Sequence, residues 1–131
     1  MDIKFTHVTF VVADIDKTVE FYREFFGLTV VRDRRAEGGS TVWLGPATPK
    51  GTAPAYVLVI EKGEVKNRLD HLGFQCAAKA DVDALAAKAK ARGALAEGPK
   101  DSGGAVGYWA LFRDPDGNLV EATCGQPIRG V

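Results

Sequence analysis

The chain has 131 residues, of which 46% are hydrophobic and 26% charged, a composition typical of one globular domain with a single sizeable core. Seventeen basic residues balance seventeen acidic ones, so the sequence lacks the excess positive charge that binds nucleic acid or an anionic membrane surface. The N-terminal segment does not have the pattern of a secretory signal, and no apolar run approaches the length of a membrane span. We therefore expect a cytoplasmic protein.

The first half of the sequence predicts a strand, a helix and three further strands. The segment HVTFVVAD at residues 7–14 alternates as a half-buried strand does. Helical spacing follows over residues 14–26, with Asp14 or Asp16 as the N-cap and Gly27 directly after the end. One apolar stripe runs along this helix: Ile15, Val19, Tyr22 and Phe26. The strands expected beyond it cover residues 28–32, 41–44 and 56–61.

The second half repeats the same order of elements. HLGFQCAA at residues 71–78 aligns with HVTFVVAD and places His71 64 residues after His7. A helix is predicted over residues 81–92 and is closed by Gly93. Its apolar stripe is thinner, and the alanine in it favours close packing on a sheet: Val82, Leu85 and Ala89. Strands are expected at residues 94–97, 108–112 and 118–124, so each half is predicted to be a βαβββ module.

Glycine and proline mark the connections between these elements. Residues 113–117, with the sequence RDPDG, place proline and glycine where a tight turn joins two antiparallel strands. Three other stretches are expected to be surface loops: 36–40, 45–54 and 98–107. The last of them contains KDSGGAVG and is predicted to be either a flexible flap beside a site or a plain connection.

Cys76 and Cys124 are the only cysteines, and they lie 48 residues apart within two strand-like segments. This spacing argues against a disulfide framework and against a zinc knuckle. We therefore expect two buried thiols that act as small apolar side chains.

Strand alternation predicts that three metal-binding side chains lie away from the helices. His7 lies on the face of its strand opposite Phe10. His71 and Glu121 likewise lie opposite the wholly apolar positions of their strands, which we expect to pack against the helices. A glutamate among apolar strand residues is costly to desolvate unless a cation accompanies it. A bound metal ion would supply that cation.

Two imidazoles and one carboxylate form a familiar donor set for Fe²⁺, Mn²⁺, Zn²⁺, Ni²⁺ or Co²⁺, and three protein ligands leave positions for water and substrate. The residues therefore predict one divalent metal ion bound by His7, His71 and Glu121. The alternative is that all three are ordinary polar residues, because lone strand histidines and glutamates near a chain end are commonly solvated. Strand alternation alone leaves both interpretations open.

Three segments together resemble the vicinal oxygen chelate superfamily, which includes glyoxalase I, fosfomycin-resistance proteins, extradiol dioxygenases and bleomycin-binding proteins. They are HVTFVVADIDKTVEFYREFFGL at 7–28, HLGF at 71–74 and FRDPDGNLVEAT at 112–123. The resemblance covers nearly the whole chain, and the motifs stand in the family's order and spacing. It implies an α+β fold in which two βαβββ modules form an open, curled mixed sheet, the glyoxalase-like fold. It implies one domain over residues 1–131, with modules at about 3–61 and 68–125.

The resemblance also implies that His7, His71 and Glu121 are the metal ligands. The candidate proton carriers are a displaced Glu121, a metal-bound hydroxide and Glu61, and Glu121 is the expected catalytic residue. Glyoxalase I-like members place a fourth ligand, usually glutamate, in the middle of the last strand of the first module. Here that strand has only Glu61, at its end, where a solvated residue is expected. The sequence is therefore more similar to the three-ligand pattern of fosfomycin-resistance enzymes and dioxygenases.

The similarity to either of these groups is partial. Thr9 matches a substrate-contacting threonine of the fosfomycin-resistance family, and Lys100 and Arg129 lie near its cationic positions, but Leu111 replaces its active-site tyrosine. Dioxygenases of this size usually carry a further histidine, which this chain lacks because it has two in all.

Together these features predict a metal-dependent glyoxalase-like enzyme, a lyase, isomerase or epoxide-opening transferase that activates a small oxygen-bearing substrate. An extradiol-type dioxygenase and a non-catalytic drug- or metabolite-binding protein of the bleomycin-resistance type remain alternatives. Six residues are expected to contact the substrate: Thr9, Trp43, Lys100, Trp109, Leu111 and Arg129. The expected partners are a small molecule with adjacent oxygens and a second copy of the chain in a homodimer, with no nucleic acid and no membrane.

Overall fold

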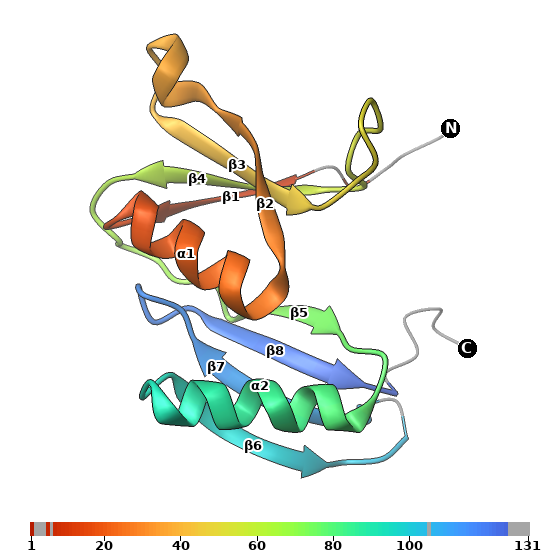
Figure 1. Ribbon diagram of the computed structural model, residues 1–131. Helices are drawn as coiled ribbons and strands as arrows, with labels where there is room; N and C mark the ends of the chain where they lie inside the picture. Colours follow the sequence, from red (N-terminus) through yellow and green to blue (C-terminus); the bar gives the residue numbers. More distant parts are fainter. Residues whose placement is uncertain (2–4, 6, 105, 126–131) are drawn as a thin grey trace. The chain divides into compact units, whose positions relative to one another are not determined.

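The computed structural model describes residues 1, 5, 7–104 and 106–125. The chain divides into two compact units, Met1–Arg68 and Leu69–Val131, which we call module 1 and module 2 and describe one at a time (Figure 1). Each module contains a four-stranded mixed sheet and one α-helix. This arrangement confirms the predicted α+β fold of two βαβββ modules. No helix among the described residues is long and apolar enough to span a membrane.

Module 1 begins with a strand whose neighbour in the sheet is the last strand of the module. Its elements are β1 (His7–Val12), α1 (Ile15–Phe26), β2 (Leu28–Asp33), the 3-10 helix η1 (Arg34–Glu37), β3 (Thr41–Pro46) and β4 (Val57–Lys62). The sheet order is β1-β4-β3-β2, with β1 and β4 parallel and the other neighbours antiparallel. The parallel pair is reached because a helix and two strands intervene between β1 and β4.

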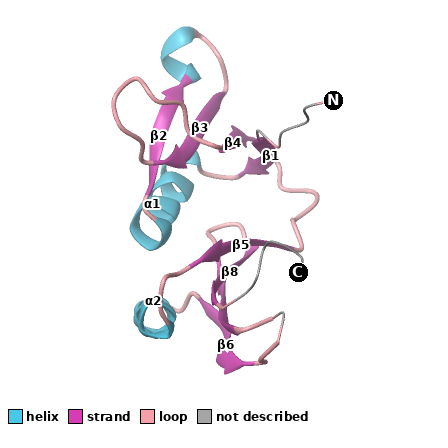
Figure 2. Cartoon of the chain, turned by 90° about the vertical axis from the view of Figure 1, so that its right-hand side faces the viewer, coloured by secondary structure: helices cyan, strands magenta, loops and turns pink. Residues whose placement is uncertain are grey.

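Module 2 repeats this connectivity. Its elements are β5 (His71–Gln75), α2 (Lys79–Ala91), β6 (Leu95–Asp101), β7 (Tyr108–Arg113) and β8 (Leu119–Cys124), and the sheet order is β5-β8-β7-β6. The first strand is again parallel to the last one. Helix α2 lies along one face of this sheet, and among the described residues of the module no helix covers the other face, which we call the helix-free face (Figure 2).

Helix α1 begins and ends as the sequence predicts. The Asp14 side chain accepts a hydrogen bond from the backbone N–H of Lys17 at 3.0 Å, and Gly27 closes the helix in the left-handed conformation. The buried face differs from the expected stripe, since Val19 and Phe26 are only half-buried. The buried residues are Ile15, Thr18, Phe21, Tyr22 and Phe25. An apolar pattern misses Thr18, which can be buried because its hydroxyl donates to the Asp14 carbonyl at 3.0 Å.

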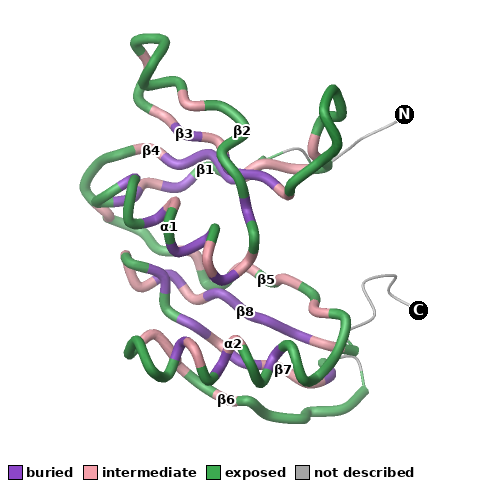
Figure 3. The backbone as a smooth tube through the Cα atoms, viewed as in Figure 1, coloured by how far each residue is buried: buried purple, intermediate pink, exposed green. Residues whose placement is uncertain are grey.

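Helix α2 begins two residues earlier than predicted, at Lys79. Asp81 therefore lies in the first turn, where its carboxylate accepts a hydrogen bond from the Ala78 N–H at 3.0 Å. The residues buried against the sheet are Val82, Ala86 and Ala89, and Leu85 is only half-buried. Small side chains at these positions allow the helix to pack closely on the strands, and Figure 3 shows the buried positions of α2 and β8.

The connections follow the sequence in one case and depart from it in another. The predicted turn at 113–117 is present between β7 and β8, with Gly117 at φ 80° and its N–H bonded to the Asp114 carbonyl at 2.9 Å. The predicted 98–107 loop is wrong in its first part, because β6 continues to Asp101. Pairing with β7 accounts for the extension, since Lys100 is the register partner of Trp109.

Candidate metal centre

The helix-free face of the module 2 sheet carries two of the predicted ligands. Register pairs bring Gly73, Glu121 and Leu111 side by side across β5, β8 and β7. Val120 and Ala122, the neighbours of Glu121 along β8, are fully buried on the other side of the strand. Since side chains alternate along a strand, the Glu121 carboxylate lies on the helix-free face.

His71 and Glu121 lie close together on this face. The Nε2 atom of His71 is 3.4 Å from Oε2 of Glu121. The other ring nitrogen, Nδ1, is 2.6 Å from Oδ1 of Asp70, the preceding residue in the chain. A carboxylate bonded at Nδ1 favours the tautomer with the proton on that nitrogen, which leaves the Nε2 lone pair free to bind a cation.

The Glu121 carboxylate is nearly enclosed by protein, with only 9% of the residue exposed. Removing a carboxylate from water is unfavourable unless a cation or hydrogen-bond donors accompany it. One side of the position stays open, because Gly73 has no side chain and a Cβ atom there would meet nothing within 4 Å. A small ligand or ion can therefore approach Glu121 over Gly73.

Module 1 presents the corresponding face with a different set of residues. His7 is exposed at the start of β1, and Thr9 lies two residues along on the same face. The parallel pairs His7↔Val57 and His71↔Leu119 align β4 with β8, so the counterpart of Glu121 is Val59. The module 1 sheet thus offers one histidine and, at the equivalent carboxylate position, an apolar side chain.

Glu61 lies two residues beyond Val59, near the end of β4. It pairs with Val11 in the register and accepts a hydrogen bond from the Ser40 hydroxyl at 3.1 Å. Its counterpart in module 2 is Thr123 rather than Glu121. The register therefore does not make Glu61 the equivalent of a fourth ligand.

The structure brings together two of the three predicted ligands within one module. His71 and Glu121 belong to module 2, and His7 belongs to module 1. Among the described residues, no three histidine, cysteine or acidic side chains form a group that could hold a metal. The pair at His71 and Glu121 fits a metal in donor chemistry and in separation, and it supplies two of the three predicted ligands.

Three of the predicted substrate contacts share the face with Glu121. Leu111 is its direct neighbour on β7, and Trp109 and Lys100 form the next row of the sheet. The Lys100 ammonium lies 5.7 Å from the Trp109 ring centroid and forms an ion pair with Glu97. Lys100 is therefore already engaged by protein groups.

Trp43 and Thr9 lie on the matching face of module 1. Trp43 is the register partner of Val59, which in turn pairs with Thr9. The Arg32 guanidinium lies 5.4 Å from the Trp43 ring centroid and donates hydrogen bonds to Glu37, which lowers the pKa of that carboxyl. Each face therefore carries a tryptophan covered by a cation that is paired with a carboxylate.

Arg129, the sixth predicted contact, lies outside the described residues.

Two residues of this centre were not identified from the sequence. Asp70 orients His71, and its only sequence signal is its position directly before the histidine. Gly73 leaves space over Glu121, and it occupies the position that corresponds to Thr9 in module 1. A residue-by-residue comparison of the two halves could have found Gly73, whereas the role of Asp70 depends on the orientation of the His71 ring.

The sequence motifs and the repeated βαβββ connectivity define the class of protein. The chain belongs to the Glyoxalase/Bleomycin resistance protein/Dioxygenase superfamily, whose family profile matches residues 4–122. This confirms the family that the sequence motifs indicated.

Two curated relatives and one solved structure illustrate the range of this family. An uncharacterized protein of Pseudomonas aeruginosa is 38% identical over 128 residues, which cover 94% of this chain and 89% of that protein. A lactoylglutathione lyase of Arabidopsis thaliana is 31% identical over 126 residues, but these span 90% of this chain and only 43% of the plant enzyme.

The fosfomycin resistance protein FosX from Listeria monocytogenes has a similar fold. A mutant of it complexed with Mn(II) and 1S,2S-dihydroxypropylphosphonic acid gives a TM-score of 0.77 at 21% identity, with 98% of this chain and 96% of that chain covered. At this identity the likeness concerns the fold.

Proposed function

We propose that this protein is a metal-dependent enzyme in which His7, His71 and Glu121 bind one divalent transition metal ion. The ion would act as a Lewis acid that polarises an oxygen of a small substrate with two neighbouring oxygen atoms. The proposed reaction class is a lyase, isomerase or epoxide-opening transfer. The single observation that carries the proposal is the 3.4 Å approach of His71 Nε2 to the enclosed Glu121 carboxylate.

The residues around this pair have separate tasks in the proposal. Asp70 holds the Nδ1–H of His71, so the ring stays oriented with Nε2 toward Glu121. Gly73 leaves the approach to the carboxylate open. Leu111 and Trp109 form an apolar border that limits water near the reacting oxygen atoms.

The proposed three-ligand pattern favours some branches of the family over others. With Val59 at the position equivalent to Glu121, module 1 contributes His7 alone and the metal keeps more positions for substrate and water. This favours the reactions in which both substrate oxygens chelate the ion. Support for metal binding also comes from the fosfomycin resistance protein of similar fold, which was solved in complex with Mn(II).

The decisive experiment measures metal content. The protein is purified without chelator, loaded with Mn²⁺, Fe²⁺, Ni²⁺, Co²⁺ or Zn²⁺, and analysed for bound metal, alongside His7→Ala, His71→Ala and Glu121→Ala variants. We expect about one equivalent in the wild type and a loss of affinity of at least tenfold in each variant, because each removes one of three ligands.

Glu61→Ala is the matched control, since it removes a carboxylate from the last strand of the other module at a position that does not correspond to Glu121. It should bind metal as the wild type does. A protein that takes up none of the five ions would refute the metal-dependent enzyme and favour the non-catalytic binding protein. A wild type that binds metal would then be assayed with dicarbonyl compounds, epoxides and catechols, and cleavage of a catechol would identify the dioxygenase alternative.

We also propose that the protein acts in the cytoplasm as a homodimer. The edge strand β2 exposes two neighbouring apolar residues, Val30 and Val31, and exposed sheet edges of this kind are commonly covered by a second chain. Light scattering after size-exclusion chromatography should give twice the chain mass. A Val31→Lys variant should lower that mass if β2 lies in the interface.

A further inference from the structure

The two cysteines are neighbours in module 2 although 48 residues separate them in the sequence. Strand β5 pairs with β8 in parallel, with Phe74 opposite Ala122 and Gln75 opposite Thr123. The ladder continues one residue further, because the Cys76 N–H donates to the Thr123 carbonyl at 2.7 Å. In a parallel ladder this hydrogen bond makes Cys76 the partner of Cys124.

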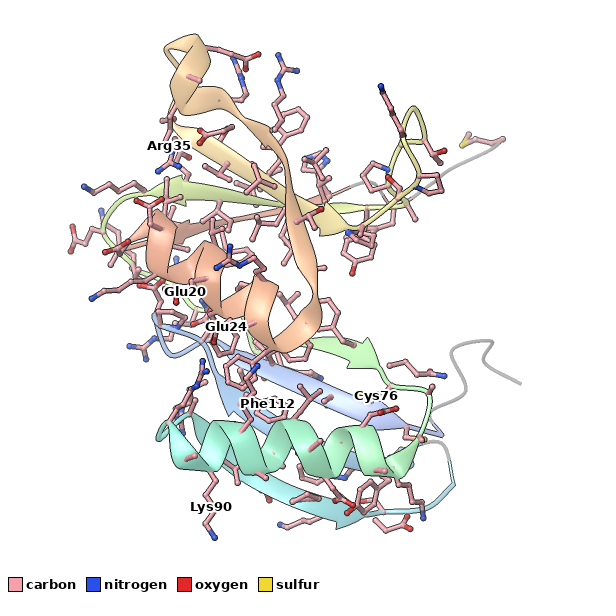
Figure 4. All side chains as sticks on the ribbon, viewed as in Figure 1. Glu20, Glu24, Arg35, Cys76, Lys90 and Phe112 are labelled. Atoms are coloured by element: carbon pink, nitrogen blue, oxygen red, sulfur yellow. The ribbon has the colours of Figure 1, made fainter. Side chains whose placement is uncertain are left out.

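The two side chains also lie on the same face of the sheet. Cys124 alternates with Thr123 and shares the side of Ala122, which is buried beneath α2, and Cys76 shares the side of Phe74. The Cys124 Sγ atom lies 3.8 Å from the carbonyl oxygen of Ala77, the residue directly after Cys76. Figure 4 shows Cys76 at the end of β5, where the chain turns into α2.

Both thiols are free, and both are half-exposed rather than buried as the sequence indicated. The expectation of buried thiols was wrong because both residues stand at strand ends, where α2 begins and covers less of the sheet. A reagent can therefore reach the pair from solvent.

We propose that Cys76 and Cys124 form a reversible dithiol–disulfide couple that joins the ends of β5 and β8. Adjacent strands lie about 4.8 Å apart, within the Cα separation of about 4.4–6.8 Å that a disulfide requires. The bridge would lie on the helix-covered face of the sheet, opposite the face that carries His71 and Glu121. The proposal is independent of the metal centre.

The oxidant in the proposed reaction is a low-molecular-weight disulfide. One cysteine thiolate attacks it and releases one thiol, which leaves a mixed disulfide on the protein. The second cysteine then attacks the protein sulfur of that mixed disulfide, the Cys76–Cys124 bond forms and a second small thiol leaves. The protein loses two electrons and two protons, and one small disulfide is reduced to two thiols.

The surroundings of Cys76 affect the rate of this reaction. Burial, together with the negative charges of Asp81 and of ionised Cys124, raises the pKa of the Cys76 thiol. Only the thiolate attacks, so bridge formation should become faster as the pH rises above neutral. A direct pairing in the sheet nevertheless favours closure, since the second thiol is already in place.

The test treats the full chain, with metal removed by a chelator, with oxidised glutathione and follows it by mass spectrometry under native conditions. We expect the wild type to lose two hydrogens, to retain no glutathione and to keep no titratable thiol, and to regain both thiols on reduction. The melting temperature should rise by roughly 5–15 °C in the bridged form, because the bridge closes a long loop in the unfolded chain.

Cys76→Ser and Cys124→Ser are the matched controls, and each should end as a stable adduct with one glutathione. The proposal is overturned if the wild type accumulates one or two glutathione adducts without bridging, or if its bridges join two chains. It is equally overturned if both thiols stay unreacted in the folded protein while reacting normally in urea.

Discussion

The two modules share a connectivity and a leading histidine, and they differ most at the centre of their last strands. His7 and His71 begin β1 and β5, and each strand pairs in parallel with the final strand of its module. At the equivalent positions of β4 and β8, module 1 has Val59 and module 2 has Glu121. The comparison shows that a single residue at equivalent positions of the two sheets determines whether this face carries a carboxylate at the centre of its last strand.

The cores of the two modules differ as well. In module 1, α1 packs through aromatic rings, with Phe21 and Phe25 stacked at 4.8 Å and Tyr22 in edge contact with Phe10 at 6.2 Å. In module 2, α2 packs through Ala86 and Ala89. Truncating one of the large rings beneath α1 would leave a cavity in the core. By contrast, the alanines of α2 bring that helix close to the strands and leave no space for a larger side chain.

The largest loss of stability is expected from a substitution in the core of module 1. Tyr22 has no exposed surface, and Tyr22→Ala should lower the free energy of unfolding by about 3–5 kcal/mol through lost burial and a residual cavity. The matched change in module 2 enlarges a buried side chain instead of shortening it. Ala89→Leu should lower the free energy of unfolding by about 1–3 kcal/mol through overpacking. Urea unfolding followed by circular dichroism measures both.

Val19→Ala, on the half-buried edge of α1, is the control for the first change and should cost clearly less than Tyr22→Ala. If Ala89→Leu leaves the stability unchanged, α2 does not pack on its sheet as closely as described here.

A second prediction concerns the turn that positions β5 and β8. The buried Asn118 side chain donates to the Asp114 carboxylate at 3.0 Å and accepts from the Leu69 N–H at 3.0 Å, just before β5. Asn118→Ala leaves the buried Asp114 carboxylate and the half-buried Leu69 N–H each short of one hydrogen bond, and we expect a loss of about 2–3 kcal/mol. Asn67→Ala, at an exposed position nearby, should be close to neutral. Equal effects of the two changes would show that the buried network does not stabilise the turn.

Much of this fold was predictable from the sequence because its signals are local. The helix boundary at Gly27 and the turn at Gly117 rest on residues that favour a left-handed backbone, and both are confirmed. The strand alternation also placed Glu121 on the helix-free face, as the register shows. These features depend on residues that are close together in the chain.

The features that the sequence did not reveal depend on pairing between strands. The adjacency of Cys76 and Cys124 follows from the β5–β8 register, which no local pattern specifies. The extension of β6 through Pro99 to Asp101 likewise depends on pairing with β7, and proline and glycine had marked this stretch as a loop. The role of Asp70 depends on which way the His71 ring points.

The last prediction sharpens the comparison of the modules and rests on the proposed metal centre. Val59→Glu gives module 1 the carboxylate that module 2 has at the equivalent position. The new carboxylate would lie on the strand beside His7, as Glu121 lies on the strand beside His71. If His7 is a ligand, the carboxylate adds a fourth one, and the metal affinity should rise about tenfold. Competition with a chromogenic chelator measures the change, and Val59→Gln is the matched control, with the same size and no charge.

The stability of the metal-free protein should move in the other direction. Val59 is 9% exposed, so an ionised glutamate there is desolvated and the variant should unfold at lower urea than the wild type until metal is added. A gain in stability on metal addition that is larger for Val59→Glu than for Val59→Gln would place the charge of residue 59 next to the ion. If Val59→Glu leaves the metal affinity unchanged, β4 does not face the metal. His7 would then not be the third ligand, and the proposed centre would need another residue in that role.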